Sequence, residues 1–478
     1  MAARAVKVSL VATAVDPTAE QALDELVADQ RDRLLDKLAR QRDHAAALWA
    51  WYHGEQDYPV VKSKYRDAYR LLIELSRTPW ARLVVDTIAE RLHVTGFRSG
   101  AAAADAEAWR LFKASSMDAD ERLVYTEALV TGCGYLSVSD GGVIAPESPF
   151  EVTHEPAPGN RRTVAAALKA YPLDWALRDW ALELYRPDAV YRWTTTLNEP
   201  LEPGGFPLDE GVRSAPEWEQ ADPYVSANPL GVVPIVPFEN RATILGGGVS
   251  ELEDCIPLLR RIDKITLDLL LTSDVAAFRQ KWATGLDVPK DPDTGKPVEP
   301  FKAAVDRLWV SDNPDTKFGT FEASDLGQYL KAKDAEIAAL AAISRVPPHY
   351  LMQSNLANPP TAESLVSSES GLVAKCRERQ RRFGEAWERT EALAFALAGV
   401  EAPALEVVWQ DAEMRNPAQV ADAATKLQTI GVPQRALWEY IGATPQQLAE
   451  WSLESAAAEL VALAEAPSPN GGAARPPA

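Results

Sequence analysis

Cysteine and histidine are scarce in this 478-residue sequence. The three cysteines lie far apart, at Cys133, Cys255 and Cys376, and the five histidines show no spacing typical of metal ligands. An odd number of distant cysteines predicts neither a disulfide framework nor a zinc site. We therefore expect no bound metal, and we interpret the thiols as buried or inert groups in a reducing compartment.

Long apolar runs are also absent. No stretch reaches the roughly 18 apolar residues that cross a bilayer, so we expect a soluble chain without membrane contact. The N-terminal segment has Arg4 and Lys7 before a short apolar stretch mixed with Ser and Thr, which matches a signal peptide only weakly. We interpret it as a loose arm.

Catalytic motifs are missing as well. Near Gly295-Lys296, Lys290 stands where a phosphate-binding loop needs its leading glycine, and Pro297 replaces the Ser or Thr that holds magnesium. The glycines at 246–248 lack dinucleotide-site spacing, and we interpret them as a hinge. No nucleophile elbow is present, and carboxylate pairs carry little signal in so acidic a chain. We expect no catalytic residue and no cofactor.

Positive charge is in the minority. The sequence has 49 Lys and Arg residues against 69 Asp and Glu, for a formal net charge of -20. Tight nucleic-acid binding needs basic groups that neutralise phosphates, so this balance disfavours it. An acidic wall would still let a duplex slide past without sticking. Charge alone does not choose between a DNA conduit and a protein without DNA.

One basic cluster lies within a predicted long helix. Charge runs on helices are usually solvated or paired, so we favour a solvated face or ion pairs with a neighbouring chain. The alternative is a patch that lies near passing phosphates. The cluster consists of Lys375, Arg377, Arg379, Arg381 and Arg382.

The chain is too long for one ordinary core, so we expect two or more packed units. Helical periodicity covers about residues 19–51 and 81–92, and an aromatic-rich block lies between them. From Leu136 to Val236, short β-branched runs alternate with Pro, Gly, Asn and Asp, which predicts strands. The pattern favours an α+β fold that is predominantly helical.

Helical periodicity returns at Ser250 and continues to about Thr284. Ser250 and Glu253 have capping-box spacing, although Pro257 conflicts with a straight start and favours a later cap, nearer Asp254. A Pro- and Asp-rich excursion at 285–325 follows, with a predicted strand at Arg307–Val310. It resembles a small module inserted between two helices.

The second helix begins near Leu326 and ends before two consecutive prolines, and a polar loop follows at 353–360. The longest periodic stretch then runs from a Thr361 cap to Gly399, and a helix of that length needs partners along it. After a predicted strand at 405–409, a proline near the first turn announces each of three short helices. These prolines are Pro417, Pro433 and Pro445.

Three sets of residues occur in an order that is hard to obtain by accident. The first is Trp51 to Glu55 with Trp80 to Asp86 and Glu90 to Phe97; the second is Val233 to Asn240 with Gly248 to Glu251; the third is Ile343 to Pro348 with Asn358 to Leu365. Through these residues and their order, the chain resembles the portal proteins of tailed double-stranded-DNA bacteriophages. The resemblance is to the long-tailed type found in phages of actinobacteria.

The resemblance implies a portal fold whose regions coincide with the segments found by periodicity. These regions are a wing at 1–245, a stem helix at 246–284, a clip at 285–325, a second stem helix at 326–346, a tunnel loop at 347–360, a long wing helix and strand at 361–410, a crown at 411–466 and a disordered tail at 467–478.

The resemblance also implies a structural role. Twelve subunits would form a ring at one capsid vertex of the virion, assembled in the host cytoplasm, through which double-stranded DNA is packaged and ejected without sequence specificity. Its expected protein partners are the terminase large subunit, head-tail adaptors, and the major capsid and scaffolding proteins. The residues that would touch DNA in the tunnel loop are Gln353, Ser354, Asn355 and Asn358.

Two alternatives belong to other classes. A head-tail adaptor or minor capsid protein would be structural but would form no central DNA channel. An unrecognised enzyme, such as a nuclease, would show metal-dependent turnover on DNA.

Overall fold

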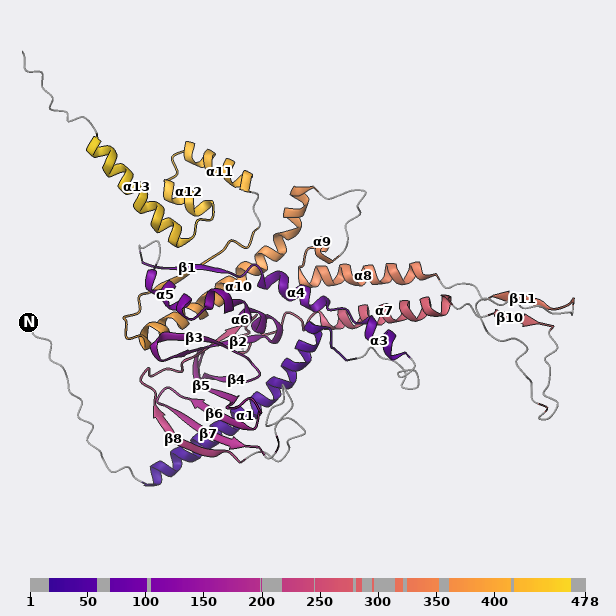
Figure 1. Cartoon of the computed structure of the whole chain (residues 1–478), viewed down its shortest axis with the longest axis horizontal. Coiled ribbons are helices and arrows are strands. Elements are labelled where there is room, and N and C mark those ends of the chain that lie inside the picture. The colour runs from indigo at the N-terminus through magenta and orange to yellow at the C-terminus, as the bar shows by residue number, and fades with distance from the viewer. Residues whose placement is uncertain are drawn as a thin grey trace, which may run out of the picture. The chain divides into compact units, whose positions relative to one another are not determined.

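The computed structural model describes residues 17–57, 69–100, 105–197, 199, 217–244, 246–277, 281–285, 295, 314–320, 325–351, 361–413 and 417–465. The chain divides into two compact units. The first contains residues 1–49, 88–250 and 375–478, and the second contains 50–87 and 251–374. Helices α1 (Pro17–His53), α4 (Trp80–Ala89) and α10 (Ala362–Leu397) contribute residues to both (Figure 1).

A five-stranded antiparallel sheet forms one part of the first unit. Its strands follow chain order: β4 (Val152–Ala157), β5 (Asn160–Pro172), β6 (Asp179–Tyr185), β7 (Ala189–Thr196) and β8 (Glu219–Ala227). Buried Val27, Leu34 and Leu38 of α1 pack in one cluster with Leu182 and Trp193 of the sheet. The sheet therefore buries one face against an amphipathic helix, as a half-solvated antiparallel sheet requires.

A second, three-stranded sheet has the order β3-β2-β9, with β2 at Cys133–Ser139, β3 at Val143–Glu147 and β9 at Ile235–Glu239. Helices α5 (Ala106–Ala114) and α6 (Met117–Thr131) pack near it. Aromatic rings of α5 and α6 pack against rings of α10. Tyr125 stacks on Phe383 at 5.5 Å between ring centroids, and Phe112 meets Trp387 edge to face at 5.1 Å.

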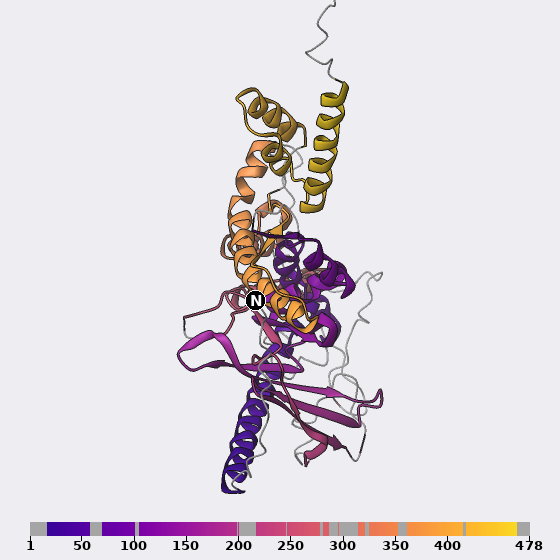
Figure 2. The ribbon, with the colours of Figure 1, turned by 90° about the vertical axis from the view of Figure 1, so that its left-hand side faces the viewer.

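The C-terminal helices follow a two-stranded ribbon in which β1 (Val94–Ser99) pairs with β12 (Leu405–Trp409). They are α11 (Pro417–Thr429), α12 (Gln434–Tyr440) and α13 (Pro445–Glu465). The predicted strand and the three proline-initiated helices are confirmed. Figure 2 shows α13 extending away from the rest of the unit.

The second unit is built on two long helices that lie side by side, α7 (Ile256–Ala277) and α8 (Leu326–Ser344) (Figure 1). The short helix α3 (Arg70–Ser76) packs against α7. Strands β10 (Lys281–Thr284) and β11 (Lys317–Thr320) pair antiparallel. The one-turn helix α9 (Pro348–Leu351) precedes α10.

Of the two starts expected for the helix after Ser250, the later one agrees with the structure: the Ser250 hydroxyl donates to the carbonyl of Val130, and α7 begins at Ile256, just after Asp254. The expected continuation to Thr284 is wrong. The helix ends at Ala277, and residues 281–284 form β10, where pairing with β11 satisfies the backbone. The strand predicted at 307–310 lies outside the described residues.

The glycine run at 246–248 shows a packing constraint that the hinge interpretation missed. A Cβ added to Gly248 would lie 1.7 Å from the carbonyl oxygen of Gly132. The two backbones therefore approach so closely that only glycine fits. The caps predicted for α10 are confirmed: the Thr361 hydroxyl accepts from the amide of Ser364 at 3.2 Å, and Gly399 ends the helix with φ +73°.

Candidate functional site

Polar contacts inside the second unit fix the paired helices α7 and α8. Asp263 on α7 is buried and accepts a 2.7 Å hydrogen bond from the side chain of Gln56, which is also buried. Burial raises the pKa of Asp263 to about 6, partly opposed by that bond. Arg261 pairs with Glu336 of α8 at 3.1 Å. No local sequence pattern indicates these contacts, because the partners are distant along the chain.

The β10–β11 pair places two aromatic rings at the surface of the second unit. Trp282 lies opposite Gly319, where an added Cβ would be only 2.4 Å from the indole ring. The indole ring therefore fits there because Gly319 has no side chain. Trp282 and Phe318 remain 38% and 41% exposed. Exposed aromatic rings on a short two-stranded ribbon suit contact with a protein partner.

Contacts between α9 and α10 tie together the two flanks of the segment at 352–360. The Tyr350 hydroxyl donates to the Glu369 carboxylate at 2.9 Å, and His349 Nε2 lies 3.8 Å from the same oxygen. Helix α9 therefore lies against the first half of α10. The predicted tunnel-loop residues Gln353, Ser354, Asn355 and Asn358 lie outside the described residues.

The five basic residues predicted as a cluster on α10 do not share one environment. Arg377 reaches Asp411 at 3.2 Å and Glu413 at 3.3 Å, so carboxylates of the same unit balance its charge. Arg379 is buried beside Glu378, and Arg382 also pairs with Glu378, at 3.1 Å. Arg381 is exposed and Lys375 half-buried. The guanidinium groups thus diverge around the helix.

Buried carboxyl groups form features that the sequence did not reveal. Glu121 accepts from the amide of Val94 at 3.1 Å and from the Tyr125 hydroxyl at 3.0 Å, and His93 lies against it. The Trp387 indole donates to the same Tyr125 oxygen at 2.7 Å. The chain of bonds ties α6, β1 and α10 together. His93 is in a stretch singled out above, but nothing local to it identifies a partner 28 residues away.

Glu391 has a different environment. Its side chain is fully buried on α10, and neither carboxylate oxygen has a hydrogen-bond partner among the described residues. Burial, aided by the nearby charge of Asp105, raises the pKa of Glu391 to about 8. The group is therefore mostly protonated at neutral pH.

Within the described ranges, no three His, Cys, Asp or Glu side chains are grouped so that they could hold a metal ion. In the same ranges, no helix is both long and apolar enough to span a bilayer.

The sequence of the chain matches the model of a known protein family. The sequence model of a family described as "Phage portal protein, SPP1 Gp6-like" matches residues 31–459. The chain belongs to this portal protein family. The match covers all the elements of both units except the first turns of α1 and the end of α13.

Curated portal proteins of two actinobacteriophages are similar over most of their length. The portal protein of Mycobacterium phage D29 is 29% identical over 479 aligned residues, which cover 93% of this chain and 92% of the relative. That of Mycobacterium phage L5 is 30% identical over 379 residues, which cover 74% and 72%. The predicted family is confirmed.

A solved structure titled as the neck of a native GTA particle computed with C12 symmetry also matches. It is 12% identical, with a TM-score of 0.39 over 80% of this chain and 92% of the other.

Proposed function

We propose that this portal protein is the ring-forming head-tail connector subunit of a tailed phage, through which DNA is packaged into the capsid and later ejected. The observation that carries the proposal is the family match over residues 31–459. Portal proteins are structural, and the chain supplies geometry and electrostatics. ATP hydrolysis belongs to the terminase, and the subunit itself makes and breaks no bonds.

The regions of the portal fold are assigned by their elements. Helices α7 and α8 are the two stem helices, and β10 with β11 forms the base of the clip. The segment between α9 and α10 is the tunnel loop, and α11 to α13 are the crown. The sheets, α1 and most of α10 form the wing. The order of helix, insert, helix, loop and long helix supports this assignment.

DNA passes without sequence recognition. The net charge of -20 disfavours adhesion to phosphate, so the duplex slides. In the tunnel loop, Gln353, Ser354, Asn355 and Asn358 offer neutral polar groups that touch the duplex backbone without reading bases.

The residues of the basic cluster on α10 divide between ion pairing and contact with DNA. The pairing of Arg377 and Arg382 with carboxylates favours ion pairs over phosphate contact. Arg381, which is exposed, remains the member best placed to approach DNA.

Several partners follow from this role. Exposed Trp282 and Phe318 suit the clip for docking the terminase large subunit during packaging and the head-tail adaptors afterwards. The wing meets major capsid and scaffolding proteins. Assembly takes place in the host cytoplasm, and the finished ring has twelve copies.

The loop role is tested by changing Asn355 and Asn358 to Gly together and measuring the DNA packaged per particle. We expect less packaged DNA or defective ejection, because the polar side chains that contact the duplex are lost. A matched control changes Asn160 and Asn228, on the wing, to Gly. Normal packaging and ejection in the loop variant would contradict the role.

The rival functions have their own readouts. Particles whose vertex shows no central channel under the electron microscope would favour an adaptor or minor capsid protein. DNA cleavage that depends on magnesium, manganese or zinc would indicate an enzyme.

A further inference from the structure

A fully exposed tryptophan lies in the turn between β5 and β6, at residues 173–178 of the first unit. The side chain of Trp175 is 103% exposed, and that of Leu173 in the same turn is 54% exposed. Tryptophan is a large, mainly apolar side chain that is usually well buried, and it is one of the residues that most often anchor protein interfaces. The turn therefore has the composition of a contact site.

The backbone of this turn is held in place by hydrogen bonds. The Asp174 carboxylate accepts from the amides of Arg178 at 2.9 Å and Asp179 at 3.0 Å. Leu177 packs against the core of the unit and has a left-handed backbone with φ +53°, which is strained for a residue other than glycine. Because the turn is fixed in advance, little conformational entropy is lost when a partner covers Trp175.

The surroundings of Trp175 carry negative charge. Asp174 and Asp179 outnumber Arg178, whose guanidinium donates to the carbonyl of Leu197 at 2.9 Å. The backbone hydrogen bonds to Asp174 lower the pKa of its carboxyl group, so this group stays ionised at neutral pH. A surface that receives the turn therefore needs an apolar cavity with a basic rim.

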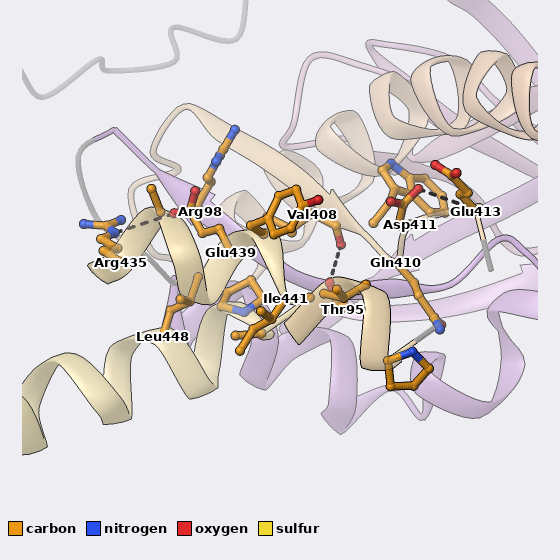
Figure 3. A pocket seen from close by; sticks show the side chains of 18 of the residues that line it. Thr95, Arg98, Val408, Gln410, Asp411, Glu413, Arg435, Glu439, Ile441 and Leu448 are labelled. Atoms are coloured by element: carbon orange, nitrogen blue, oxygen red, sulfur yellow. Dashed lines mark hydrogen bonds and ion pairs between the residues drawn. The ribbon is translucent and has the colours of Figure 1, made fainter. Parts of the chain in front are cut away.

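The groove between the β1–β12 ribbon and helices α11 to α13, of about 1030 Å³, does not meet these conditions. Its lining has two arginines against three carboxylates. Both arginines already pair with glutamates, Arg98 at 2.8 Å and Arg435 at 3.6 Å. Figure 3 shows Asp411 and Glu413 at the opposite end of the groove. An acidic turn is repelled from such a lining.

A smaller cavity between α1 and β4 does meet them. Its volume is about 280 Å³. Leu34 and the aliphatic stems of the long basic side chains supply apolar surface, while their charged ends form the rim. The lining residues are Arg33, Leu34, Asp36, Lys37, Arg40 and Glu155.

The charge of this α1–β4 cavity is net basic. Arg33 pairs with Glu155 at 3.5 Å, which leaves Lys37 and Arg40 against Asp36. Arg40 is exposed and has no hydrogen bond or ion pair within the described part of the chain. The cavity thus offers an uncompensated guanidinium to an acidic partner.

An indole ring suits a cavity with a free guanidinium, because a cation over an aromatic face is attracted by the ring quadrupole. Helix α1 already makes one such contact within the unit, where Arg31 Cζ lies 5.1 Å from the centroid of the Trp193 ring. The same chemistry is open to Arg40 once an aromatic side chain from outside enters the cavity.

The turn of the same chain does not reach the cavity. Glu155, at the cavity, pairs with Ala166 of β5. Strand β5 continues from Ala166 to Pro172, which is about 20 Å at 3.3 Å per residue, before the turn begins. An indole from another molecule is therefore needed to fill it.

We propose that the Trp175 turn of one copy of this chain inserts into the α1–β4 cavity of the neighbouring copy, with the indole ring against the Arg40 guanidinium. Turn and cavity are different patches of one subunit, which is the arrangement of a head-to-tail interface that closes into a ring. The inference rests on the proposed ring function, and it adds to that function a contact that joins adjacent wings.

Cross-linking tests where the turn lies in the assembly. The full-length double variant Ala176→Cys/Asp36→Cys keeps Trp175 and Arg40 and adds one exposed thiol to the turn and one to the cavity. Treated with a short bis-maleimide, it should give a ladder of covalent multimers on a denaturing gel. Each single variant should give no more cross-linking than the wild type. Rings of the double variant without a ladder, or a cross-link within one chain, would overturn the proposal.

Ring stability tests the contact itself. Trp175→Ala should raise the protein concentration at which half of the rings dissociate by roughly tenfold or more, because it removes a buried anchor. Arg40→Ala should raise it less. Since the two side chains touch, the double variant should lose less than the product of the two single effects. Leu123→Ala is the matched control: Leu123 is 56% exposed on α6 and lies outside the cavity, so its rings should be unchanged.

The outcomes separate this inference from the proposed function. A wild-type protein that forms no ring contradicts the proposed function itself. Equal ring stability in Trp175→Ala and the wild type contradicts the wing contact alone, and so does a loss that multiplies across the two single variants. Stable Trp175→Ala rings that fail to enter particles would assign the turn to a different protein and overturn the inference.

Discussion

At the residue scale, Glu391 is a fully buried carboxyl group without a hydrogen-bond partner in the described part of the first unit. A carboxyl without hydrogen bonds in an apolar core costs much less to bury protonated than charged, which is why its pKa is raised to about 8. The unfolded chain returns the group to its ordinary pKa near 4.5. Between pH 4.5 and pH 8, Glu391 therefore takes up a proton when the chain folds.

The sign of the pH dependence follows directly. Between pH 4.5 and 8 the folded state binds more protons at Glu391 than the unfolded state, so the free energy of unfolding falls as pH rises. Glu391→Gln removes this loss. We expect the variant to exceed the wild type in unfolding temperature at pH 8, by an amount that reflects on the order of a few kcal/mol, and to differ little at pH 4.5.

The control for this substitution is Glu385→Gln, on the same helix but exposed. It should leave the pH profile of thermal unfolding unchanged. If Glu391→Gln and the wild type lost stability in parallel as pH rises, the buried carboxyl would not be the cause.

At the element scale, the packing of α9 on α10 depends on a contact between Tyr350 and Glu369. Tyr350→Phe keeps the ring and removes the hydroxyl that donates to Glu369. A hydrogen bond to a charged group contributes about 1.5–3 kcal/mol, so amide hydrogen exchange in α9 should accelerate while α7 keeps its protection. Tyr329→Phe on α8 is the control. Unchanged exchange in α9 would show that other contacts hold α9 on α10.

Elements were predictable where one local signal decides them. The proline and cap residues located α10 to α13, and periodicity located α7 and α8, because each pattern lies within its own segment. The end of α7 was missed, because residues 281–284 form a strand only through pairing with a segment more than 30 residues later. The contacts of Asp263, Glu121 and Glu369 were missed because burial and distant partners leave no local pattern.

At the scale of the whole molecule, identity was predictable and detailed sites were not. The ordered stretches from Trp51 to Leu365 identified the family. No single stretch is specific, but their order along the chain is. The basic cluster on α10 shows the reverse case. Five cations close in sequence diverge around a helix. Arg379 and Arg382 pair with Glu378 of the same helix, whereas Arg377 pairs with Asp411 from a later part of the chain.

The central claim is that identical copies of this chain assemble around a channel. The most direct measurement is the native mass of the purified full-length protein, combined with electron microscopy of the same sample and of particles. The account predicts a closed ring of twelve copies with an open centre, also present at one vertex of the particle. A protein that remains a monomer in solution, and a particle vertex without a channel, would contradict it.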